Sequence, residues 1–154
     1  MFHRFQYEAE FYPDLNRLPL HLRMKLDVTG IKLSLRQWLA FSLEERKVLC
    51  HLPVADTEEL QAFVEYINFL CQRYNGIPAP RVPPLSPASW NTQDRIPEPV
   101  LKKSRDNGQS ITLEEWTGWQ SHEQYGLYKT AVSKDEPEKF VAVLTELRQR
   151  RVEN

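Results

Sequence analysis

The stretch RLPLHLRMKLDVTGIKLSLRQWLAFSLEERKVL, residues 17–49, decides the fold because the chain uses it twice. It returns 78 residues later, without a gap, as RIPEPVLKKSRDNGQSITLEEWTGWQSHEQYGL at residues 95–127. Average composition gives about two identities by chance over such a window, and this alignment has eight. The residues of the first copy that recur are Arg17, Pro19, Lys25, Gly30, Leu35, Trp38, Glu45 and Leu49. A repeat of this length predicts one helical unit used twice, with the two copies burying each other's apolar faces.

The position of the repeat predicts how the chain is organised. We expect one domain over 1–154, built from an N-terminal arm at 1–16, repeat one at 17–76, a Pro-rich linker at 77–94 and repeat two at 95–154. Seven of the eleven prolines lie in 77–99, so this connection is not expected to be helical. In the arm, Phe5, Tyr7, Ala9 and Phe11 alternate with polar residues. This alternation predicts an extended segment with one apolar face.

Capping signals and apolar spacing predict the helices. Ser34, Ser42 and Thr112 each stand three residues before a Gln or Glu, which is the capping-box pattern. Asp56 or Thr57 can cap a helix whose apolar residues recur every three or four positions. Helices are expected near 19–29, 35–41, 43–51, 57–74, 98–106, 113–120, 121–131 and from 137 onward. The fold class is therefore all-α, with six to eight helices in two related repeats that form one bundle.

Composition excludes several classes of protein. The net charge of −1 is less basic than a generic nucleic-acid or membrane binder requires. No apolar run is long enough to span a bilayer, and the first eleven residues do not resemble a secretory signal, so we expect a cytoplasmic protein. Cys50 and Cys71 are the only cysteines, and an iron–sulfur cluster needs about four such ligands. We therefore expect two reduced thiols and no intrinsic cluster.

Residue types that carry catalysis or bind metals do not converge in the sequence. The segment from Asp106 to Glu115 is similar to the end of a calcium-binding EF-hand loop, but Gly108 is misplaced and cations precede it. In the first copy Gln37 replaces the bidentate Glu. The four histidines are scattered, and catalysis needs groups that converge. We expect no catalytic, cofactor-binding or metal site, and Trp38 and Trp116 are predicted to be core anchors.

The two copies differ in charge, and that difference is the clearest functional signal. The first copy carries basic residues at positions where the second does not, since Lys32 corresponds to Ser110 and Arg36 to Glu114. Residues 17–36 form a basic face, with five basic residues against the single acid Asp27. Two interpretations are open: this face docks on an acidic protein partner, or it pairs with the acidic residues at 56–65 of the same chain. The predicted partner-binding residues are Arg23, Lys25, Lys32 and Arg36.

Residues 18–38, LPLHLRMKLDVTGIKLSLRQW, resemble the signature of the nitrate reductase associated protein family, which is best known from cyanobacteria. The arm at 5–11, the segment 44–46 and the block 111–116 are also similar, so the resemblance covers nearly the whole chain. It implies a small cytoplasmic accessory protein needed for active assimilatory nitrate reductase, an enzyme with a molybdenum cofactor and an iron–sulfur cluster. The family has no established catalytic residues, so none is carried over.

The sequence and the resemblance together favour a non-enzymatic protein that binds the nitrate reductase catalytic subunit. It would support maturation, stability or electron delivery, and a ferredoxin-type electron donor is a further candidate partner. No cofactor, nucleic acid or membrane is expected to bind. The alternative is a stand-alone regulatory binding module, either degenerate EF-hand-like or a nucleic-acid-binding helical protein.

Overall fold

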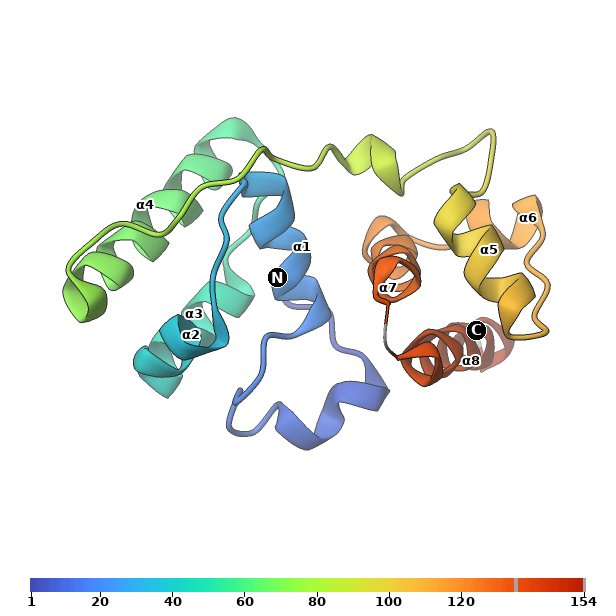
Figure 1. Ribbon diagram of the computed structural model, residues 1–154, viewed down its shortest axis with the longest axis horizontal. Coiled ribbons are helices and arrows are strands. Elements are labelled where there is room, and N and C mark those ends of the chain that lie inside the picture. The colour runs from blue at the N-terminus through green and yellow to red at the C-terminus, as the bar shows by residue number, and fades with distance from the viewer. Residues whose placement is uncertain (135, 154) are drawn as a thin grey trace. The chain divides into compact units, whose positions relative to one another are not determined.

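A computed structural model of the chain describes residues 1–134 and 136–153 and is built from helices (Figure 1). Within these residues the only β-pairing is an isolated antiparallel bridge between Ile31 and Arg81. The all-α class predicted from the sequence is confirmed. The elements in chain order are the 3-10 helix η1 (Gln6–Phe11), α1 (Leu20–Thr29), α2 (Leu35–Ala40), α3 (Leu43–His51), α4 (Thr57–Asn75), the 3-10 helix η2 (Pro87–Ser89), α5 (Glu98–Asp106), α6 (Leu113–Thr117), α7 (Ser121–Val132) and α8 (Pro137–Glu153).

The chain divides into two compact units. Unit 1 contains residues 1–4 and 8–85, with α1 to α4, and unit 2 contains residues 5–7 and 86–154, with α5 to α8. The division after residue 85 falls inside the predicted linker, 77–94. The starts of α1 and α5, of α2 and α6, and of α3 and α7 lie 78 residues apart. This spacing agrees with the offset in the sequence, while the tandem repeat itself stays a prediction.

Local capping sets the helix boundaries in unit 1. Ser34 with Gln37, Ser42 with Glu45, and Asp56 with Glu59 each form a complete capping box, in which side chain and backbone bond in both directions. Such a box satisfies two backbone N–H groups that a helix start leaves without partners. The boxes that were expected at Ser34 and Ser42 are therefore confirmed.

Unit 1 packs around Trp38, which is fully buried and donates from its indole N–H to the Leu15 carbonyl at 2.7 Å. The Pro-rich segment lies beside the end of α1, where the Val82 N–H donates to the Gly30 carbonyl at 2.9 Å. Gly30 has a φ of 71°, and a Cβ there would lie 2.5 Å from the Val82 carbonyl oxygen. Glycine is thus required by both the left-handed backbone and the close approach.

The N-terminal arm was predicted to be extended, and this is wrong for Gln6–Phe11, which forms η1. The reason lies at Glu8, which the alternating pattern assigned to the solvent side but which is buried. Its carboxylate accepts hydrogen bonds from the Leu20 N–H at 3.0 Å and the Tyr12 hydroxyl at 2.8 Å. Pro19, the N-cap of α1, makes no side-chain cap, so Glu8 supplies the anion that a helix start favours.

In unit 2, α7 packs against both α5 and α8. Trp116 is fully buried and its indole N–H donates to the Thr92 hydroxyl at 3.1 Å, so Trp38 and Trp116 are both core residues as expected. The capping box expected at Thr112 is only half formed, because the Glu115 carboxylate accepts from Arg148 at 2.7 Å and not from the helix start. None of the helices described in residues 1–134 and 136–153 has the length and apolar character that crossing a bilayer requires.

Candidate partner-binding surface

The structure removes Lys25 from the predicted partner-binding residues. Its side chain is 1% exposed, and its ammonium donates to the Cys50 carbonyl at 2.5 Å and to the Met1 carbonyl at 3.0 Å. Burial lowers its pKa from 10.5 to about 8, because the charged form is disfavoured away from water. The ammonium therefore holds carbonyl groups inside unit 1 and cannot meet a partner's surface.

The sequence held a signal for this role. Lys25 is one of the residues identical in the two copies, and Lys103, its counterpart, donates to the Ser133 carbonyl at 3.0 Å. In both units the lysine bonds a carbonyl near the C-terminal end of a helix, α3 or α7. A cation in this position is favoured by the negative end of the helix dipole, so a residue shared by the copies serves their architecture.

The other three predicted residues are exposed. Arg23 lies on α1 and its Nε donates to the Leu18 carbonyl at 3.1 Å. Lys32 precedes α2 and Arg36 lies in its first turn. Within the described residues, none of the three forms an ion pair with an acidic residue at 56–65. The three cations are therefore available to a partner.

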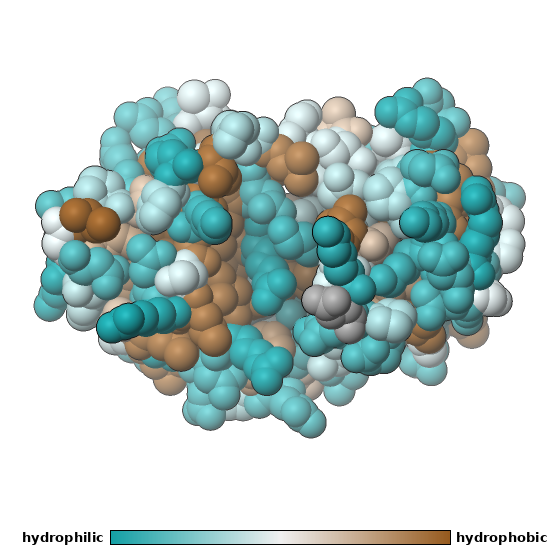
Figure 2. All heavy atoms as spheres, in the orientation of Figure 1, coloured by the Kyte–Doolittle hydropathy of each residue, from teal (hydrophilic) through white to brown (hydrophobic). Residues whose placement is uncertain are grey.

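Two leucines on α2, which the sequence analysis did not select, extend this surface. Leu35 is 47% exposed and Leu39 is 43% exposed, and residues four apart lie on the same face of a helix. Figure 2 shows apolar residues over the part of unit 1 where Figure 1 places α2, bordered by hydrophilic residues. We call Lys32, Leu35, Arg36 and Leu39 the α2 surface.

The same positions in unit 2 have a different chemistry. Leu35 corresponds to Leu113, which is 41% exposed, but Arg36 corresponds to Glu114 and Leu39 to Thr117. With Ser110 in place of Lys32, the α6 counterpart is acidic and carries one leucine where the α2 surface carries two. The combination of two exposed leucines and two cations is therefore particular to unit 1.

Among the described residues, the remaining reactive residue types form no metal site, although the ring centroids of His3 and His21 lie 4.7 Å apart. Cys50 and Cys71 are free thiols buried in unit 1, and burial raises the pKa of the Cys50 thiol to about 12. Within the part of the chain that is described, no group of three or more His, Cys, Asp or Glu side chains is placed to hold a metal ion. Glu115, which an EF-hand loop would need as a ligand, is bonded to Arg148.

Comparison with models of known protein families matches residues 4–147 to the conserved nitrate reductase-associated protein family. The match includes the α2 surface and the whole of α1 to α7. Neither a search of curated proteins nor a search of solved structures returns a match to the chain.

Proposed function

Because the chain belongs to the conserved nitrate reductase-associated protein family, we propose that it is a non-enzymatic accessory protein that binds assimilatory nitrate reductase through the α2 surface. The family match over residues 4–147 is the observation that carries the proposal, since the name of the family indicates association with nitrate reductase. The binding partner is the catalytic subunit, which carries the molybdenum cofactor and an iron–sulfur cluster.

The composition of the α2 surface supports docking. Exposed leucines beside cations are the kind of mixed surface that a protein interface buries, with apolar groups at the centre and charges at the rim. Covering the exposed parts of Leu35 and Leu39 contributes about 1 kcal/mol each, from the area that each leaves in water. Lys32 and Arg36 add attraction to a partner that presents carboxylates. The complementary surface on the reductase is therefore acidic with an apolar centre.

A direct test is whether the two proteins form a complex. Purified catalytic subunit and the full 154-residue chain are mixed and separated by size-exclusion chromatography at 50 and 300 mM salt. The proposal expects co-elution at low salt and a weaker complex at high salt, because the rim charges are screened. If the proteins elute separately at both salt concentrations, the proposal is wrong.

Three measurements on the reductase distinguish how binding would help it. The enzyme is expressed with and without the chain, and its molybdenum content, its thermal midpoint and its activity are compared. A lower molybdenum content without the chain indicates maturation, and a lower thermal midpoint indicates stabilisation. A loss of activity with a ferredoxin-type donor, but not with a reduced viologen dye, indicates electron delivery. Equal values in all three measurements would contradict an accessory function.

A further inference from the structure

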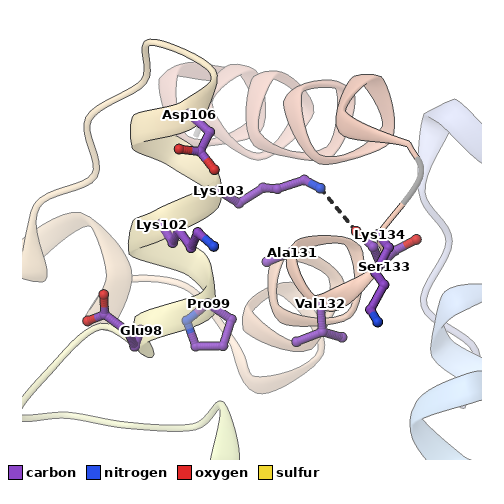
Figure 3. A pocket seen from close by; sticks show the side chains of 9 residues that line it. All are labelled: Glu98, Pro99, Lys102, Lys103, Asp106, Ala131, Val132, Ser133 and Lys134. Atoms are coloured by element: carbon purple, nitrogen blue, oxygen red, sulfur yellow. Dashed lines mark hydrogen bonds between the residues drawn. The ribbon is translucent and has the colours of Figure 1, made fainter.

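Unit 2 contains a pocket that the proposed function does not use. It has a volume of about 430 Å³ and lies between one face of α5 and the C-terminal end of α7 (Figure 3). Pro99, Ala131 and Val132 give it apolar walls, and Lys102 and Lys134 lie at its rim. α3 ends at His51, which corresponds to Lys129 in unit 2, whereas α7 continues three residues further, to Val132. This longer end of α7 forms part of the pocket wall.

The corresponding place in unit 1 is filled by the chain itself. Pro99 corresponds to His21 and Lys103 to Lys25. The His3 N–H donates to Nδ1 of His21 at 2.9 Å, and the Met1 carbonyl accepts from Lys25 at 3.0 Å. The Phe2 ring stacks on the His21 ring with centroids 6.3 Å apart. In unit 1, therefore, a short peptide with an aromatic side chain covers the face of α1 that corresponds to the pocket face of α5.

We infer that the pocket in unit 2 binds an extended peptide segment of a partner protein that carries an apolar side chain flanked by carboxylates. The apolar side chain lies against Pro99 and Val132, as Phe2 lies against His21. Lys103 uses one ammonium proton for the Ser133 carbonyl, so two remain for a peptide carbonyl. This repeats the arrangement of Lys25, which bonds two carbonyl groups.

The charges at the rim select the acidic character of the peptide. Within the described residues, Lys102 and Lys134 form no ion pair. In Figure 3, Lys102 extends from α5 toward Ala131, and the Lys134 side chain lies on the other side of Val132. Glu98 also lines the pocket but points away from the end of α7 in the same view. Asp106, at the C-terminal end of α5, is the second carboxylate that lines the pocket, against three lysines. Carboxylates on the peptide would pair with the two lysines.

The same charges disfavour the N-terminal segment of a second copy of this chain. That segment carries Arg4 after Phe2 and His3, and Arg4 would place a cation between Lys102 and Lys134. Like charges brought together at an interface are costly. The pocket lies outside the α2 surface, and peptide binding there does not depend on the identity of the reductase.

Fluorescence anisotropy of the full chain with a labelled probe peptide, acetyl-Glu-Phe-Asp-Glu amide, tests the inference. The expected result is saturable binding that Lys102→Glu weakens at least fivefold, because one attraction becomes a repulsion. Arg105→Glu is the matched control, since Arg105 is an exposed cation on the same helix outside the pocket. The affinity of the Arg105→Glu variant for the probe should stay within twofold of the affinity of the wild type.

Four results would overturn the inference. Displacement of the probe by millimolar inorganic phosphate would indicate a general anion site. Equal weakening of probe binding by Arg105→Glu and Lys102→Glu would indicate unspecific charge attraction. If the backbone NMR signals that shift on binding do not include Val132, the peptide binds outside the pocket. Absence of binding at millimolar peptide would also contradict it.

Discussion

Replacing Lys25 by methionine should change how the stability of unit 1 depends on pH. Methionine keeps the length of the side chain and removes the ammonium, together with its bonds to the Cys50 and Met1 carbonyls. The burial of Lys25 lowers its pKa to about 8 in the folded chain, whereas the unfolded chain has the ordinary value of 10.5. Between these two pH values the unfolded state binds more protons, so the free energy of unfolding rises with pH.

The size of the effect follows from the two pKa values. For a group with a folded pKa of about 8 and an unfolded pKa of 10.5, linkage gives a gain of about 2 kcal/mol between pH 7 and pH 9.5. The Lys25→Met variant lacks this gain. The free energy of unfolding of the wild type minus that of the variant therefore increases by that amount. Cys50, whose pKa burial raises to about 12, titrates in both proteins and largely cancels in the comparison.

The assay follows the indole NMR signal of Trp38 during urea unfolding, because Trp38 is the tryptophan of unit 1. Lys32→Met is the matched control, since it removes an exposed ammonium from the same unit. A difference between wild type and Lys25→Met that stays constant from pH 7 to pH 9.5 would refute the burial of this charge. It would also restore Lys25 as a candidate contact.

Two further substitutions test the packing of unit 1. Gly30→Ala should destabilise the unit by about 3 kcal/mol, as judged by urea unfolding. The new Cβ would lie 2.5 Å from the Val82 carbonyl oxygen, and alanine would be strained at the positive φ of this position. Gly76→Ala, which has a φ of 78° and open space around it, should cost only about 1 kcal/mol; equal effects would contradict the close approach. Glu8→Ala should cost about 2 kcal/mol by leaving the buried Leu20 N–H without a partner, and hydrogen exchange at Leu20 should accelerate. Unchanged exchange at Leu20 would show that Glu8 does not cap α1.

Features whose partners are close in sequence could be predicted. The capping residues Ser34 and Ser42 bond groups three positions away, so the pattern alone located the starts of α2 and α3. The same holds for α4, where Asp56 bonds Glu59. Gly76, with its positive φ, ends α4 within one residue of the expected position.

Features that depend on distant partners could not be predicted. Glu8 is buried because it bonds Leu20, which lies twelve residues away, and the alternating pattern around it indicated an extended segment. Glu115 completes the capping pattern with Thr112 in sequence, but Arg148 takes its carboxylate from 33 residues away. In both cases a tertiary contact outweighs a local preference.

Only part of the candidate surface could be predicted, because burial and exposure also depend on tertiary contacts. The net positive charge of residues 17–36 selected Lys32 and Arg36, which are exposed, but also Lys25, which is buried. Comparing identities would have excluded Lys25, because Lys103 matches it. The exposure of Leu35 and Leu39 could not be predicted, because it depends on which face of the short helix α2 packs inward.

The most direct test of the α2 surface is the affinity of the full chain for the purified nitrate reductase catalytic subunit, measured by biolayer interferometry for two reciprocal variants. Arg36→Glu gives unit 1 the residue found in unit 2, and Glu114→Arg does the reverse. The expected result is that Arg36→Glu weakens binding by about tenfold, equivalent to about 1.4 kcal/mol, while Glu114→Arg leaves the affinity within twofold. Equal affinities for the wild type and Arg36→Glu would contradict docking through the α2 surface.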